Sequence, residues 1–267
     1  MLKTRIILIV ASAIVVWLIF LLPKAVVENE GQMEGETSPS DQPDPHTTAP
    51  LALRQSINSL KAQYLEASEN EKSAIFADSL ASLYAQASQF DSAAWFAEKA
   101  ASFLNSKESL LKAGNSYYDA YTFALEANKQ NEMAEKTRFY LGQVLQMEPG
   151  NLEIKTKIAM TYLSSQNPMQ GIAMLREVLA EDPKNEQALF NMGMLSIQSG
   201  QYDRAAERLE ELISHYPNHV QGHLLLGVAY MNTRQKEKAI SQFELVKKLD
   251  QDPAVQAAAD SYLQDLK

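Results

Sequence analysis

Three histidines at four-residue intervals are the residues whose type and spacing come nearest to a reactive site. Two imidazoles four residues apart on one helix, such as His219 and His223, supply half of a zinc site. His215 does not extend this set, because Pro217 interrupts the helical pattern between it and His219. No third ligand is evident nearby, and His223 takes a place held by a packing leucine, Leu189, one segment earlier. We therefore expect structural histidines, with no metal and no cofactor; a metal-dependent enzyme is the alternative.

Other catalytic signatures are absent from the sequence. It contains no glycine-rich phosphate loop, no Ser/His/Asp order and no metalloprotease helix motif. It also contains no cysteine, which excludes a disulfide framework, a thiolate metal site and a cysteine nucleophile. The net charge of −9 argues against nucleic acid as a partner, because nucleic acid requires clustered lysine and arginine. The sequence predicts a protein that is not an enzyme.

Three prolines indicate how the elements around these residues are organised. Pro149, Pro183 and Pro217 recur every 34 residues, and a fixed period of this length is typical of a helical solenoid. Each period reads as two amphipathic helices, with small residues where the helices approach and large ones beside them. The columns are Ala159, Gly193 and Gly227; Gly171, Ala205 and Ala239; and Leu175, Leu209 and Phe243.

These columns resemble the tetratricopeptide repeat (TPR) family. Its small, aromatic and proline positions are met by Ala159, Tyr162, Leu175 and Pro183; by Gly193, Ala205, Leu209 and Pro217; and by Gly227, Tyr230, Ala239 and Phe243. The sequence departs from the pattern at Gly171, at Ser196 and at the displaced Pro253. The resemblance implies an all-α fold, a right-handed superhelix of helical hairpins, and a role in protein–protein interaction.

On this interpretation the chain divides into nine segments. They are a membrane anchor (1–25), a disordered acidic linker rich in Pro and Gly (26–50), an N-terminal helix (51–73), a divergent repeat (74–106), a stretched repeat (107–151), three regular repeats (152–185, 186–219 and 220–253) and a cap helix (254–267). In the stretched repeat, Gly114 and Thr137 are 23 residues apart, whereas Gly193 and Ala205 are 12 apart. The additional residues either lengthen the helices or form a protruding loop.

The anchor is predicted from an apolar run near the amino terminus. Residues 6–22 carry no charge, follow Lys3 and Arg5, and precede an acidic stretch. This length is at the short end for a membrane-spanning helix, and the charge asymmetry places the amino terminus in the cytoplasm. We expect a single-pass protein with its repeats on the periplasmic side of a bacterial inner membrane. A cleaved signal peptide ending near 23–25 is the alternative.

The family resemblance also implies a binding surface, because first helices line the concave side of TPR superhelices. The positions carried over are Thr156, Met160, Leu163, Phe190, Met194, Ile197, Leu224, Val228 and Met231. Eight of the nine are apolar and three are methionine, which adapts to varied partners. Some of these side chains could instead belong to the core between helices. The lysine and asparagine set with which some members grip acidic chaperone tails is not reproduced.

Two functions agree with these observations. The first is a membrane-tethered scaffold, adaptor or chaperone-like holder in envelope-complex assembly, which binds an apolar or amphipathic segment of a partner protein in its groove. The alternative is a self-associating structural protein whose groove is filled by residues 121–132 or by another copy. Neither involves nucleic acid.

Overall fold

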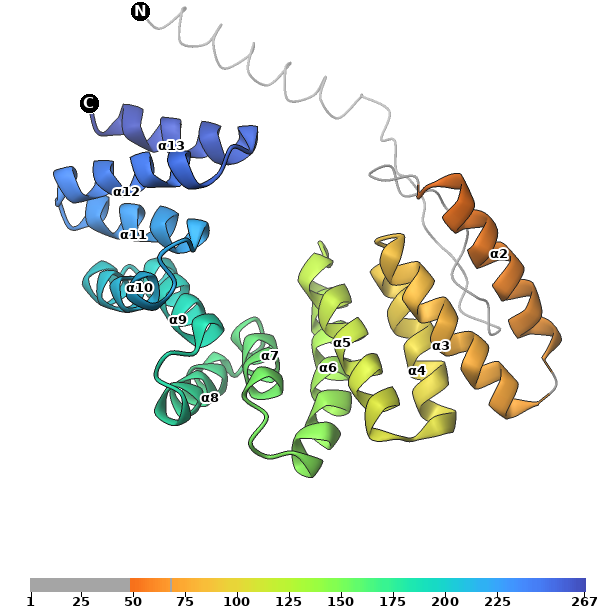
Figure 1. The fold of residues 1–267 in the computed structure, drawn as a ribbon. Helices are drawn as coiled ribbons and strands as arrows, with labels where there is room; N and C mark the ends of the chain where they lie inside the picture. The colour runs from red at the N-terminus through yellow and green to blue at the C-terminus, as the bar shows by residue number, and fades with distance from the viewer. Residues whose placement is uncertain (1–48, 68) are drawn as a thin grey trace, which may run out of the picture. The chain divides into compact units, whose positions relative to one another are not determined.

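The computed structural model describes residues 49–67 and 69–267, and within them all regular structure is α-helical (Figure 1). The twelve helices are α2 (Leu51–Glu66), α3 (Asn70–Gln86), α4 (Phe90–Leu104), α5 (Lys107–Phe123), α6 (Ala127–Met147), α7 (Leu152–Leu163), α8 (Pro168–Glu181), α9 (Glu186–Gln198), α10 (Tyr202–His215), α11 (Val220–Asn232), α12 (Lys236–Leu249) and α13 (Pro253–Asp265). The predicted anchor and all but the last residues of the predicted linker lie outside the described residues. Within the described ranges, no helix has both the length and the apolar character needed to cross a bilayer.

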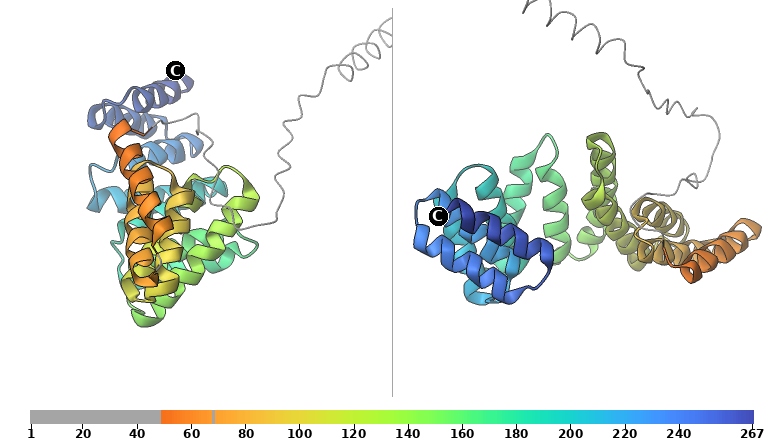
Figure 2. Two further views of the ribbon diagram at one scale, coloured as in Figure 1. Left: turned by 90° about the vertical axis from the view of Figure 1, so that its right-hand side faces the viewer. Right: turned by 90° about the horizontal axis from the view of Figure 1, so that it is seen from above.

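The helices form consecutive hairpins that stack in chain order. The pairs are α3–α4, α5–α6, α7–α8, α9–α10 and α11–α12, with α2 packed on the first pair and α13 on the last. Figure 2 shows the same succession of helices from two further sides. Since each hairpin contacts mainly its neighbours, residues 49–67 and 69–267 form the helical solenoid that the repeat period predicts.

The recurring prolines mark the turns between hairpins. Helices α6, α8 and α10 each end two residues before one of the prolines, whose ring cannot continue a helix. The residue two places after each proline begins the next helix by accepting a hydrogen bond from a backbone N–H. Asn151 accepts from Ile154, Asn185 from Ala188 and His219 from Gly222. The 34-residue period is thus a repeated stop and start signal.

Small residues lie where the two helices of a hairpin approach most closely. A Cβ atom on Gly193 would lie 2.7 Å from Leu209 Cδ2, and one on Gly227 would lie 2.6 Å from Phe243 Cε1. Both large partners are fully buried. The small and large columns are therefore complementary parts of one core, as expected from close packing.

The stretched repeat is accommodated by longer helices. Helix α5 has 17 residues and α6 has 21, whereas α9 has 13 and α10 has 14. Only residues 124–126 separate α5 from α6, so the additional residues form no protruding loop. Residues 121–132, which the alternative function assigns to filling the groove, occupy the end of α5 and the start of α6.

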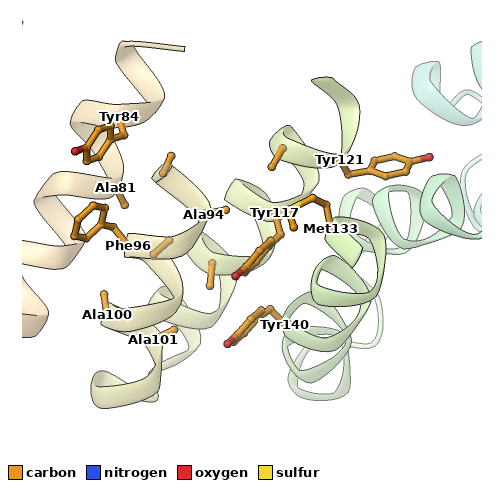
Figure 3. Close-up of a cluster of buried hydrophobic side chains, with 14 of the residues drawn as sticks. Ala81, Tyr84, Ala94, Phe96, Ala100, Ala101, Tyr117, Tyr121, Met133 and Tyr140 are labelled. Carbon is orange, nitrogen blue, oxygen red and sulfur yellow. The ribbon is translucent and has the colours of Figure 1, made fainter. Parts of the chain in front are cut away.

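The core consists of two large clusters and a small one between them. The amino-terminal cluster extends from α2 to α7 and contains many alanines, which bring the helices close together (Figure 3). Within it, Tyr117 and Tyr140 stack with ring centroids 5.8 Å apart. The carboxy-terminal cluster extends from Leu189 to Ala259. A junction cluster of Ala159, Leu175, Val178 and Ala188 lies between them.

Candidate partner-binding surface

Two of the histidines have structural roles, as predicted. His219 is the cap of α11, where its Nδ1 accepts from the backbone N–H of Gly222 at 2.9 Å. His223 is buried, with Nε2 2.8 Å from the carbonyl of Pro217 and Nδ1 2.7 Å from the Gln242 side chain. A carbonyl only accepts, so Nε2 must donate to it. In the part of the chain that the structure describes, no three His, Cys, Asp or Glu side chains gather as a metal-ligand set.

The nine predicted groove positions lie on the first helices of three consecutive hairpins, α7, α9 and α11. Eight of them are partly exposed. Thr156 is the exception, because it is only 2% exposed and its hydroxyl donates to the carbonyl of Leu152 at 2.8 Å. This threonine therefore supplies no accessible surface, and the candidate surface consists of the other eight residues.

Some of the eight also support the core, as the alternative interpretation of these positions expects. Leu163 packs against the junction cluster, and its Cδ2 lies 2.9 Å from where a Cβ on Gly171 would be. Phe190, Ile197 and the three positions on α11 pack on the carboxy-terminal cluster with one side and remain partly exposed on the other. Met160 and Met194 belong to none of the three clusters. The side chains of these two methionines therefore lie outside the three core clusters.

An aromatic contact joins the α9 part of this surface to α11. The ring of Phe190 stacks on the imidazole of His219, with centroids 5.1 Å apart. Nε2 of the same imidazole lies 3.8 Å from Glu186 Oε1 at the start of α9. The apolar row on α9 is thus fixed next to the first turn of α11.

Polar side chains on the first helices α3, α5 and α7 pair with one another across neighbouring repeats. Lys112 of α5 donates to Ser82 Oγ of α3 at 2.8 Å and lies 2.7 Å from Asp78 Oδ1. Lys157 of α7 donates to Asn115 Oδ1 of α5 at 2.9 Å. Lys157 also bonds to a carboxylate on its own helix. Links between repeats hold this face, and the repeat pattern did not predict them.

The first helix of the candidate surface, α7, is anchored to the stretched repeat. Tyr121 donates to the carbonyl of Met160 at 3.0 Å, and its hydroxyl lies 3.0 Å from Ser164 Oγ. Arg138 donates to the carbonyl of Thr161 at 2.9 Å and lies over the ring of Tyr162. The lengthened helices α5 and α6 therefore brace α7 from one side.

A second polar cluster surrounds Glu98 on α4. Its carboxylate accepts hydrogen bonds from Tyr140 at 2.9 Å, from Lys136 at 2.6 Å, and from Tyr117. Burial alone would raise the pKa of Glu98, but these hydrogen bonds and the lysine charge outweigh it and lower the pKa. Burial, with the carboxylate as a further cause, raises the pKa of both tyrosines. Because three donors already satisfy Glu98, the cluster ties α4, α5 and α6 together.

Hollows elsewhere do not overlap the candidate surface. One of about 250 Å³ is lined by residues of α2, α3 and α4, including Tyr64 and Lys99. Another of about 280 Å³ lies between α12 and α13, around Leu263. Neither of these two hollows is lined by a predicted groove residue.

Comparison with known proteins identifies the repeats. A family model described as tetratricopeptide repeat matches residues 129–189, 162–221 and 196–261. No curated protein matches the chain.

Among solved structures, MamA 41-end from Desulfovibrio magneticus RS-1 is 17% identical, covers 67% of this chain and 97% of its own, and has a TM-score of 0.51. A crystal structure of MamA protein is 19% identical, covers 68% and 93%, and has a TM-score of 0.48. The structure of YrrB, described as a TPR protein with an unusual peptide-binding site, is 19% identical, covers 79% and 98%, and has a TM-score of 0.46. At these identities the likeness concerns the fold alone.

Proposed function

Because this chain contains tetratricopeptide repeats in residues 129–261, we propose that it is a non-enzymatic protein–protein interaction module. It binds an apolar or amphipathic segment of a partner on the first helices of its carboxy-terminal repeats. One observation carries the proposal: eight apolar side chains on α7, α9 and α11 are partly exposed at corresponding positions of successive hairpins. Exposed apolar side chains of this kind are typical of interaction sites on soluble domains.

A double substitution tests this proposal in the full chain. Phe190→Asp with Met194→Asp places two charges on the surface, and partner capture from solubilised membranes should be lost. A matched control is Phe139→Asp with Met169→Asp, since these residues are 61% and 65% exposed and lie on α6 and α8. Capture should persist in the control. Equal capture by both variants, with helical content intact, would contradict the proposal.

The proposed setting is the periplasmic side of a bacterial inner membrane, with residues 1–25 as a retained anchor. Support comes from the uncharged run at residues 6–22 and the basic residues before it. A tether raises the local concentration of the module near membrane partners, which suits an adaptor or chaperone-like holder in envelope-complex assembly.

Membrane fractionation, protease accessibility and the mass of the mature chain test this setting. Membrane retention and protease access to the repeats are expected for the full chain, and Ile14→Arg should reduce retention. A mature chain that begins near residue 25 would identify a cleaved signal peptide instead.

Self-association is the second candidate function, favoured by exposed apolar residues where α5 meets α6. Phe123 is 62% exposed and Leu125 is 99% exposed. A second copy could bury both. Sedimentation of the full chain in mild detergent tests this: a dimer that dissociates on Leu125→Ser favours self-association, whereas a monomer excludes it under those conditions.

A further inference from the structure

A tyrosine at one position of the first helix joins each of three hairpins to the hairpin before it. Tyr117 of α5 donates to Glu98 of α4, and Tyr230 of α11 donates to Glu210 of α10. Tyr162 of α7 holds a guanidinium group of α6 over its ring. In each case the contact reaches from a first helix to the second helix of the preceding hairpin, so the tyrosine links neighbouring repeats.

Helix α9 lacks this tyrosine. Ser196 occupies the position, and its hydroxyl donates to the carbonyl of Met192 on the same helix at 2.8 Å. The acceptor is replaced as well, because Arg176 of α8 lies 34 residues before Glu210 and has an exposed side chain. The tyrosine link is therefore missing between α8 and α9, which lie in the middle of the solenoid (Figure 1).

No other polar contact takes the place of this link. Residues 152–181 and 186–215 are all described by the structure, and no side-chain hydrogen bond or ion pair joins one of these hairpins to the other. The contact between them is apolar, since Ala188 of α9 packs with Leu175 and Val178 of α8 in the junction cluster. Apolar attraction has no preferred direction, whereas a hydrogen bond weakens steeply when it is bent. The two hairpins can therefore shift against each other without breaking a directional contact.

The turn between these hairpins has its pivot at Asp182. The backbone N–H of Asp182 donates to the carbonyl of Val178 at 2.8 Å, which fixes it to the end of α8. Two residues later, the carbonyl of Lys184 accepts from the hydroxyl of Tyr216 at 2.9 Å, which fixes it to the turn before α11. Pro183 lies between them with its φ locked by the ring. The backbone dihedrals of Asp182 therefore remain to absorb a change of angle.

We propose that the solenoid bends at this joint, with helices α2 to α8 as one body and helices α9 to α13 as the other. The candidate surface spans the joint, because Met160 and Leu163 lie on α7 and its other six residues lie on α9 and α11. Bending therefore changes the separation between the two parts of the surface, as hinge motions do in other proteins. The bending does not depend on the function proposed above.

Distances between spin labels in the full chain test this proposal. The chain contains no cysteine, so labels attach only at introduced ones. Glu135→Cys with Glu207→Cys spans the joint from α6 to α10, while Ser59→Cys with Glu135→Cys and Glu207→Cys with Ser261→Cys each lie within one body. All four positions are exposed. The distance distribution across the joint should be broader than both controls, and a distribution no broader than theirs would overturn the proposal.

Restoring the link tests the cause of the bending. Ser196→Tyr with Arg176→Glu supplies at this joint the pair found at Tyr230 and Glu210, so the excess width of the distribution should be lost. The matched control, Ser196→Tyr with Arg176→Ala, supplies the tyrosine without its acceptor and should retain more of that width. A folded link variant with the full width would overturn the assignment of the motion to the missing link. If the link variant loses helical content, the label pairs in the otherwise unchanged chain still decide whether the joint bends.

The outcome for the proposed function is separate. The spin-label measurement needs no partner, so a rigid joint would overturn the bending and leave the binding surface standing. Equal capture of partners by the Phe190→Asp, Met194→Asp variant and its control would contradict the binding surface and leave the bending standing.

Discussion

Phe190 stacks on His219, the residue that caps α11, so one imidazole both begins a helix and supports the candidate surface. Its Nδ1 faces the backbone N–H of Gly222, while its ring face meets the phenyl group of α9. A change at His219 is therefore expected to affect stability and the position of Phe190 by separate routes.

Substitution of this histidine separates the two roles. His219→Asn retains a side chain that caps well, so the free energy of unfolding should stay near that of the wild type. His219→Ala removes the cap and should lower it by about 1 kcal/mol. Urea denaturation measures both. Equal stability of the two variants would mean that the cap contributes little.

Glycine-to-alanine substitutions distinguish a required close approach from a tolerated glycine. At Gly227 the new Cβ would lie 2.6 Å from the buried ring of Phe243, so Gly227→Ala should destabilise by about 1–3 kcal/mol. At Gly142 nothing lies within 4 Å, and Gly142→Ala in the interior of α6 should stabilise by about 0.5–1 kcal/mol. Opposite shifts in denaturation midpoint are expected. Shifts of the same sign would contradict the packing of the small column.

The Glu98 cluster predicts that the free energy of unfolding decreases at acid pH. Because its folded pKa is lowered, the contribution is present above the unfolded pKa, about 4.3, and is lost as pH falls through the folded value. In the Glu98→Gln variant, the free energy of unfolding should depend less on pH in the acid range. Unfolding measurements at successive pH values test this. Wild type and variant with the same acid dependence would show that other carboxylates dominate.

The two tyrosines of this cluster, Tyr117 and Tyr140, predict that the free energy of unfolding decreases at alkaline pH. Their folded pKa values are raised, so their contribution is present below the unfolded value, about 10, and is lost as pH rises above it. Tyr117→Phe with Tyr140→Phe should reduce the loss of stability at high pH. A spectroscopic titration would contradict this account if both phenols ionised at the ordinary pKa while the helices remained folded.

Local signals in the sequence predicted the hairpins well. Pro149 and the helix cap Asn151 lie in one turn, and Gly193 packs against Leu209 of the same hairpin. Because these residues are close in sequence, the repeat period is enough to locate the turns and the hairpin contacts. The stretched repeat left two alternatives open, since both longer helices and a loop agree with its spacing. The structure resolves this in favour of longer helices.

Contacts between repeats were not predictable in the same way. Lys112 meets Asp78 across 34 residues, and Tyr117 meets Glu98 from the next helix, but neither pair follows from the period of one amphipathic helix. Thr156 was assigned to the groove by register alone, whereas its hydroxyl is satisfied by its own helix and its side chain is buried. The position of a residue within the repeat predicts which helix carries it. Whether its side chain is buried depends also on the packing of the neighbouring hairpin.

Photo-crosslinking from position 194 tests the central claim most directly. A benzophenone amino acid replaces Met194 in the full chain, and a second variant carries it at Met169, which is 65% exposed on α8. We predict a crosslink to a partner protein from position 194 and none from position 169. Identical products from both positions, or no product from position 194 in intact cells, would contradict the assignment of the binding surface.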